Sequence, residues 1–406
     1  MVLKKTVLNI LYFIFLFDTF FIPPMHIYGV TFKLSYYIAF FSLIVKIISM
    51  LLSGKIIIKK EVFLLFTIAV LIFLGWLNYI RLQEDNSFKI TFLYISIMLT
   101  GMGSYYFGSN FRYKKIYFSF PIIFLIINIL LIIFIGKNTA LSDFYYTTDK
   151  LTTQLNLRYT GMSVNPNATA LIANILLIFM LLLIKNEKFK IGLKKCSFLN
   201  INLFLILPTS ITIFLLQSRS GLACFALIVL IFYTQCYSNT RNLGKVKTIL
   251  FFTLTILFFC LIFGSTVNLN ILHNLGLGNL ERVYSLQKGY EERINKFSAS
   301  VYWSRIFYSP ILGSGADISN SRPFDKYHYH NDYVALWSAG GIFALILYLI
   351  FIYFVVKKEP LLLPPFIFPG LTNAFLWNMI AFSTVLFLYS YSSNLYIGNK
   401  LKEKVL

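Results

Sequence analysis

Residues 328–356 read HYHNDYVALWSAGGIFALILYLIFIYFVV, and this stretch decides the class of fold. From Tyr333 to Val356 it is an apolar run, long enough to cross a bilayer core, which takes about 20 helical residues. Its first residues end a long polar segment, 265–332, that has no span of its own. A segment of that kind is usually either functional or disordered, and its arginines, tryptophan and histidines favour a functional one.

The rest of the chain repeats this alternation of apolar runs and connectors. The 406 residues are 58% hydrophobic and 13% charged, whereas a soluble protein carries about 25% charged residues. The apolar runs are continuous and do not alternate in polarity, which excludes a membrane β-barrel. No cleavable signal peptide is expected, because the run after Lys5 is long enough to span. Composition therefore predicts an all-α polytopic membrane protein.

The apolar runs predict about 11–12 transmembrane helices and a long periplasmic loop. The candidate spans are 6–24, 34–52, 62–80, 88–107, 116–136, 168–184, 201–217, 221–237, 247–264 and 333–356. Residues 360–392 are interrupted by prolines and make either two short or tilted spans, or one span with an interfacial piece. These spans divide the chain into four predicted parts, namely N-terminal helices over 1–157, core helices with the Arg158 and Arg219 motifs over 158–264, the loop 265–332, and C-terminal helices over 333–406.

The basic residues indicate the orientation of the chain. Lysine-rich connectors alternate along the sequence and therefore share one side, which the positive-inside tendency makes cytoplasmic. The net charge of +21 then needs no nucleic acid as a partner. The arginines assigned to the periplasmic side are Arg81, Arg158, Arg219, Arg282, Arg293, Arg305 and Arg322. Arginine is preferred where a planar fork grips phosphate or carboxylate, so an outer site for an anionic substrate explains them; chance in a small sample is the alternative.

Two short motifs place polar residues at outer helix ends. Asn165-Pro166-Asn167 makes a turn suited to cap the span that begins near Ala168. An outward helix N-terminus is a natural anion site, although a cap without further function is the alternative. Ser218-Arg219 lies in a very tight turn between two spans. Arg219 is therefore either a preorganised phosphate grip or a residue that reaches lipid headgroups.

The end of the long loop is suited to proton transfer. His330 stands just before the apolar run, and imidazole is the side chain best suited to take a proton near neutral pH. Nearby arginines would keep it neutral and able to act as a base. The alternatives are a histidine at a helix start that pairs with a carbonyl, and His328 in the same role. Trp303 offers a surface for sugar rings or an interfacial anchor, and the turn from Pro310 to Gly315 has no function that the sequence assigns.

The order of these motifs resembles the O-antigen ligase/polymerase (Wzy/WaaL) family across about 158–356. The motifs that carry the resemblance are Arg158-x-x-Gly161 with Asn165-Pro-Asn167, Ser218-Arg219, Arg293 ahead of Pro310 and Gly313-x-Gly315, and His330-Asn331-x-Tyr333 with Gly340-Gly341. Residues before about 150 match only in being membrane spans.

The resemblance implies a GT-C-like fold and an inverting, metal-independent glycosyl transfer on the periplasmic side, without a cofactor. Its donor would be an undecaprenyl-diphosphate-linked oligosaccharide in the bacterial inner membrane, and membrane lipids and a chain-length regulator are candidate partners. Carried onto this chain, Arg219 and Arg293 would grip the diphosphate, and His330 would activate the acceptor hydroxyl. Further substrate-binding candidates are Arg158, Arg282, Arg305, Trp303, Asn167, Asn331 and Tyr333. Fixed guanidinium groups can neutralise the charge that grows on a diphosphate leaving group.

Three functions remain open at this point. A polymerase that joins lipid-linked repeat units is the favoured one, and a ligase that transfers the glycan to lipid A-core is the alternative. A transporter for a lipid-linked sugar belongs to another class. Transporters tend to place ionisable groups near mid-membrane and to show repeated halves. Here the spans hold few charges, with Asp18 and Lys46 as candidates, and the arginines are assigned to outer loops.

Overall fold

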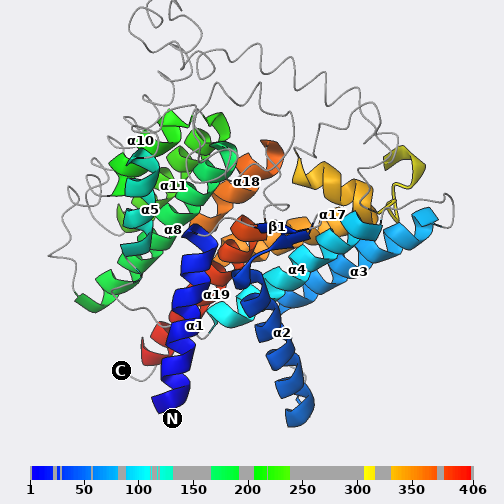
Figure 1. Cartoon of the computed structure of the whole chain (residues 1–406), viewed down its shortest axis with the longest axis horizontal. Coiled ribbons are helices and arrows are strands. Elements are labelled where there is room, and N and C mark those ends of the chain that lie inside the picture. The colour runs from blue at the N-terminus through cyan, green and yellow to red at the C-terminus, as the bar shows by residue number, and fades with distance from the viewer. Residues whose placement is uncertain are drawn as a thin grey trace, which may run out of the picture. The chain divides into compact units, whose positions relative to one another are not determined.

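In the residues that it describes, the computed structural model consists of helices, one short hairpin and connecting turns (Figure 1). It describes residues 2–21, 25–27, 30–55, 58–80, 88–109, 111, 117, 119–130, 166–191, 205–216, 218–237, 306–315, 331–372 and 379–403. The hairpin joins β1 (Met25–Ile27) to β2 (Val30–Phe32) as antiparallel strands. The predicted all-α polytopic membrane protein is therefore confirmed, with this hairpin as its one addition in the described chain.

Four helices within the described residues are long and apolar enough to cross a membrane. They are α2 (Leu34–Ser53), α3 (Lys60–Ile80), α8 (Pro166–Ile191) and α17 (Asp332–Lys358). The remaining helices are α1 (Val2–Phe21), α4 (Phe88–Gly108), α5 (Ser119–Leu130), α10 (Leu207–Leu215), α11 (Arg219–Tyr237), η5 (Pro360–Leu362), α18 (Leu363–Thr372) and α19 (Met379–Glu403). The predicted span 247–264 lies outside the described residues, and the total of about 11–12 spans stays a prediction.

The C-terminal segment forms a short helical piece and a long helix. η5 and α18 contain prolines near their starts, where a missing backbone N–H leaves no helical bond unmade. α18 has only 10 residues, which is too short to cross a bilayer core. α19 has 25 residues and is therefore long enough to cross, although it is not among the four helices named above. These lengths favour one span with an interfacial piece over two short or tilted spans.

The first compact unit comprises residues 1–120 and 301–406. At its centre α4 packs against α19, α2 and α3, while α17 packs on α3 and α18 (Figure 1). Small residues let α4 approach its neighbours closely. A Cβ atom on Gly103 would overlap the carbonyl of Ala39 in α2, and Ser42 Oγ donates to the Gly103 carbonyl at 2.7 Å. On the side of α19, Ser104 Oγ and Ser383 Oγ are 3.2 Å apart.

Both charges expected inside the spans have local structural roles. The buried Asp18 accepts a hydrogen bond at 2.7 Å from the backbone N–H of Ser35, in the first turn of α2. A carboxylate on one helix thus caps the N-terminus of the next and complements its dipole. Lys46 lies over the ring of Tyr106, with 5.7 Å from its ammonium nitrogen to the ring centroid. Neither contact resembles a translocation pathway.

Candidate functional site

The turn that ends in Gly313-Ser314-Gly315 docks on a break in α17. Helical geometry stops at Gly341, where φ is 74° and ψ is −178°, a conformation that is essentially restricted to glycine. In a continuous helix the Ser338 and Ala339 carbonyls would accept from residues 342 and 343. Instead, the Ser314 N–H donates to the Ser338 carbonyl at 2.8 Å, and the Gly315 N–H donates to that of Ala339 at 3.0 Å.

The same turn also forms hydrogen bonds with α17 residues on both sides of Gly341. The N–H of Ile342 donates to the Pro310 carbonyl at 2.9 Å, and the indole N–H of Trp337 donates to the same oxygen at 3.1 Å. Irregular backbone within a membrane protein is tolerated where the protein itself satisfies the exposed polar groups. The turn therefore substitutes for the helical bonds that α17 lacks.

Five glycines allow three backbones to meet here; we call Gly75, Gly313, Gly315, Gly340 and Gly341 the glycine cluster. A Cβ atom on Gly75 of α3 would overlap the Ala339 carbonyl, and one on Gly341 would overlap that of Ile311. A Cβ atom on Gly315 would lie 2.8 Å from Trp76 Cα. α3, the turn (yellow in Figure 1) and α17 thus meet backbone to backbone.

The side chain of Asn78 in α3 forms hydrogen bonds with the turn. Its Nδ2 atom donates to Ser309 Oγ at 3.1 Å and to the Gly313 carbonyl at 3.2 Å. These bonds connect residues that are far apart in sequence, so no local pattern predicts them. The turn to which the sequence assigned no function is a docking element between two membrane helices.

The start of α17 is fixed by Asn331 and Tyr333. Asn331 is the N-cap, and its side-chain oxygen accepts from the N–H groups of Tyr333 at 3.0 Å and Val334 at 3.1 Å. The hydroxyl of Tyr333 donates to the Phe366 carbonyl of α18 at 3.0 Å. Both residues therefore have structural roles in the described chain, and their predicted contacts with substrate stay predictions. His330 immediately precedes this cap and lies outside the described residues.

The two described residues that flank segment 316–330 are therefore both attached to the first half of α17. Gly315 is bonded to Ala339, and Asn331 caps the helix at the other end of the same half. The two attachment points are separated by about two helical turns, or about 12 Å along the axis. Arg322, His328 and His330 belong to this segment.

The second compact unit, residues 121–300, contains the start of α11. Ser218 is its N-cap, with Oγ accepting from the Gly221 N–H at 3.2 Å, and Asn174 Nδ2 of α8 donates to the Gly221 carbonyl at 2.9 Å. A Cβ atom on Gly221 would lie 2.8 Å from that of Ala170, so α8 and α11 pack closely here. The backbone of Arg219, the first residue of α11, is thereby fixed, as the tight turn predicted. Its side chain lies outside the described residues.

Asn167 is the second residue of α8, because the helix begins at Pro166. A proline in the first position is a common helix start, so the cap position precedes Pro166, and the span begins slightly earlier than predicted. Asn174, one of the residues that fix α11, was missed because a buried polar residue within an apolar run has no distinguishing local pattern. The predicted site residues outside the described ranges are Arg158, Arg282, Arg293, Trp303, Arg305 and His330.

Long apolar helices, glycine-mediated contacts and polar groups satisfied within the protein define a polytopic membrane protein. Residues 203–349 match the family model described as O-antigen ligase. This match confirms, over residues 203–349, the resemblance to the O-antigen ligase/polymerase (Wzy/WaaL) family that the motifs predicted. The matched range includes α10, α11, the docked turn and the broken part of α17. No curated protein and no solved structure matches the chain.

Proposed function

We propose that the protein is a surface-polysaccharide polymerase of the bacterial inner membrane. It joins undecaprenyl-diphosphate-linked repeat units on the periplasmic face. The family match supports a ligase- or polymerase-type enzyme that acts on a lipid-linked glycan. The polymerase assignment, the carrier and the side of the membrane are our proposals.

In the proposed reaction an acceptor hydroxyl oxygen attacks the anomeric carbon of the donor sugar. The new carbon–oxygen bond forms as the bond to the diphosphate breaks, with inversion at that carbon. His330 takes the hydroxyl proton, and the lipid diphosphate leaves with its electron pair. Arg219 and Arg293 neutralise the charge that develops on the leaving group, which is the main electrostatic task of such a step.

The observation that carries this proposal is the attachment to α17 of the two described residues that flank segment 316–330. Catalytic groups must be held within about 0.5 Å of a productive geometry. The glycine cluster holds one end of the segment and the Asn331 cap holds the other. A general base at position 330 would thus adjoin a fixed backbone.

The start of α11 gives independent support for Arg219. Peptide N–H groups at a helix N-terminus favour anions, and Arg219 is the first residue of a helix of 19 residues. The Ser218 cap and the Asn174 bond restrain this backbone. A guanidinium group added to such an end suits a diphosphate.

Purified protein with undecaprenyl-diphosphate-linked repeat units tests the reaction directly. We expect His330→Ala and Arg219→Ala to abolish chain extension, while His328→Ala, the matched control, retains it. We also expect full activity in EDTA. Normal polymer from both His330→Ala and Arg219→Ala would contradict the assignment, and loss in EDTA that added metal restores would contradict the metal-free mechanism.

The ligase is the second candidate, and the description of the matched family favours it. Both enzymes use the same donor and differ only in the acceptor. A strain that lacks the protein separates them by its glycans. Single repeat units attached to lipid A-core indicate a polymerase, whereas polymer left on the carrier lipid indicates a ligase.

A further inference from the structure

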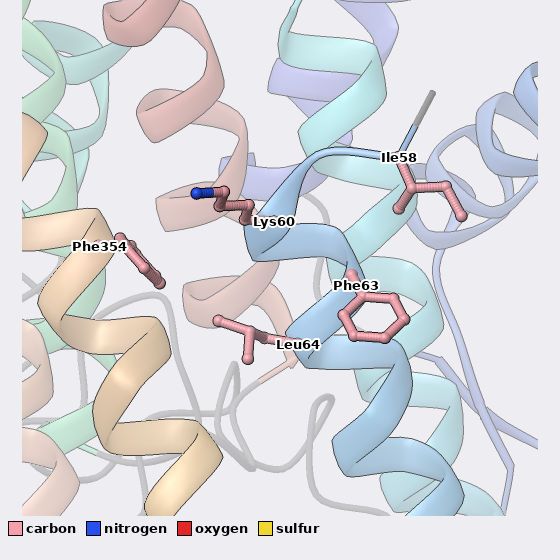
Figure 2. A pocket seen from close by; sticks show the side chains of 5 residues that line it. All are labelled: Ile58, Lys60, Phe63, Leu64 and Phe354. Atoms are coloured by element: carbon pink, nitrogen blue, oxygen red, sulfur yellow. The ribbon is translucent and has the colours of Figure 1, made fainter. Parts of the chain in front are cut away.

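A groove lies between the start of α3 and the end of α17. Its volume is about 300 Å³, and its lining residues are Ile58, Lys60, Phe63, Leu64 and Phe354. Figure 2 shows Leu64 and Phe354 pointing toward each other from the two helices, with Lys60 extending into the same gap. Phe63 is 56% exposed, so the groove opens at the outer surface of the helices. Four apolar side chains and one ammonium group thus make up the lining.

Lys60 has no acidic partner within the described part of the chain. The neighbouring acid, Glu61, is only 4% exposed. It accepts from Lys358 Nζ at 2.6 Å and from the Tyr389 hydroxyl at 2.5 Å. Lys60 itself is exposed and forms no hydrogen bond or ion pair with any residue in the described part of the chain. A basic group therefore stands at an apolar groove whose nearby acid is already paired.

The groove lies at the ends of two candidate membrane spans. The ion pair between Glu61 and Lys358 brings the first turn of α3 level with the last turn of α17. Both helices are long and apolar enough to cross a membrane, and at these joined ends the apolar stretch of each gives way to lysines. Lys59 and Lys357 are also exposed there and add positive charge.

We propose that this groove binds one anionic glycerophospholipid. The lipid phosphate pairs with Lys60, and part of one acyl chain lies along Phe63, Leu64 and Phe354. Ligand pockets range from about 300 to 1,000 Å³, so a groove of this size takes a chain segment and excludes a whole glycan. Basic pockets between membrane helices are suited to anionic headgroups. A zwitterionic lipid would bring its own ammonium group toward Lys60 and bind less well.

Native mass spectrometry of the purified full-length chain tests the proposal. The probes are phosphatidylglycerol and phosphatidylethanolamine with identical acyl chains. We expect the chain to retain phosphatidylglycerol preferentially, and Lys60→Gln to weaken that binding about fivefold, as loss of one basic residue near an anionic group predicts. Leu64→Trp fills the groove and should reduce retention of both lipids. Lys55→Gln is the matched control, because Lys55 is exposed nearby but does not line the groove.

Two results would overturn the proposal. One is equal retention of the two lipids by the unmodified chain. The other is an equal loss of phosphatidylglycerol in Lys55→Gln and Lys60→Gln, which would indicate diffuse attraction to a basic surface. Because Lys60 is exposed, its replacement leaves packing intact, so Lys60→Gln decides the question even if Leu64→Trp does not fold. The outcome is independent of the glycosyl-transfer activity.

Discussion

Gly341→Ala tests whether the docked turn organises the proposed active site. Alanine at this position must adopt a φ of 74° and a ψ of −178°, and its Cβ atom would overlap the Ile311 carbonyl. That carbonyl belongs to backbone, which cannot rotate away as a flexible side chain can. The substitution therefore forces either the turn away from α17 or α17 into a continuous helix.

The expected magnitude follows from these contacts. A backbone conformation this rare costs about 1–3 kcal/mol for a residue other than glycine. Undocking also removes the three backbone bonds made by Ser314, Gly315 and Ile342, each with a net contribution of about 1 kcal/mol. Undocking relieves the backbone strain, so the two costs are alternatives, and the three lost bonds come to about 3 kcal/mol against a total stability of about 5–15 kcal/mol for a typical protein. Local undocking is thus favoured over global unfolding.

Hydrogen exchange followed by mass spectrometry measures this undocking. In the unmodified protein we expect the amides of Ser314, Gly315 and Ile342 to be protected, and in Gly341→Ala to exchange much faster. Gly54→Ala is the matched control: Gly54 has a φ of 62°, but nothing lies within 4 Å of an added Cβ atom. It incurs a backbone cost of about 1–2 kcal/mol without a clash, so the three amides should stay protected.

The reasoning would be refuted if Gly341→Ala kept all three amides protected. It would equally be refuted if Gly54→Ala exposed them as strongly, because strain alone would then explain the effect. If the amides open in Gly341→Ala and the protein still extends glycans normally, the docked turn is real but does not position the catalytic segment.

Three further predictions concern single side chains. Asn331→Ala removes the two N-cap bonds of α17 and should lower thermal stability by about 0.5–2 kcal/mol, while Asn331→Asp retains most of it; equal melting of the two variants would contradict the cap. Arg293→Lys keeps the charge but loses the planar fork, so we expect glycan extension to fall severely; unchanged extension would remove Arg293 from the diphosphate grip. Burial lowers the pKa of Lys33 to about 7, against a smaller opposing effect of Asp18. Because the unfolded chain keeps that proton up to about pH 10.4, stability should rise with pH from about 7 to 10. In Lys33→Met, thermal unfolding should show a smaller rise of stability with pH.

Helix positions were predictable where hydrophobicity alone decides them. The run 34–52 became α2 (Leu34–Ser53), and 333–356 became α17 (Asp332–Lys358). An apolar run of bilayer length has few alternatives to a helix, because unsatisfied backbone polar groups in hydrocarbon cost several kcal/mol each, by order of magnitude. Errors appeared at the ends, as at Pro166, where local backbone chemistry sets the first residue.

The break in α17 was not predictable in this way. Hydropathy does not register that Gly341 leaves the helical conformation, because its neighbours on both sides are apolar. The compensating bonds come from Pro310, Ser314 and Gly315, which lie in another part of the sequence. Glycines 340 and 341 were noticed only through the family resemblance, and Gly313 and Gly315 were noticed as part of a turn without an assigned function. The role of these glycines becomes visible only in the structure, where the turn packs against α3 and α17.

The break also divides α17 into parts with different tasks. Residues 342–358, at about 1.5 Å per residue, form a helix about 26 Å long, which nearly equals a hydrocarbon core of about 30 Å. The preceding part, from Asp332 to Gly340, is therefore not needed for crossing and can support the loop. It holds the docked turn at one end and the Asn331 cap at the other. In the proposed reaction, this part of α17 would give His330, the residue that precedes the cap, a fixed neighbouring backbone.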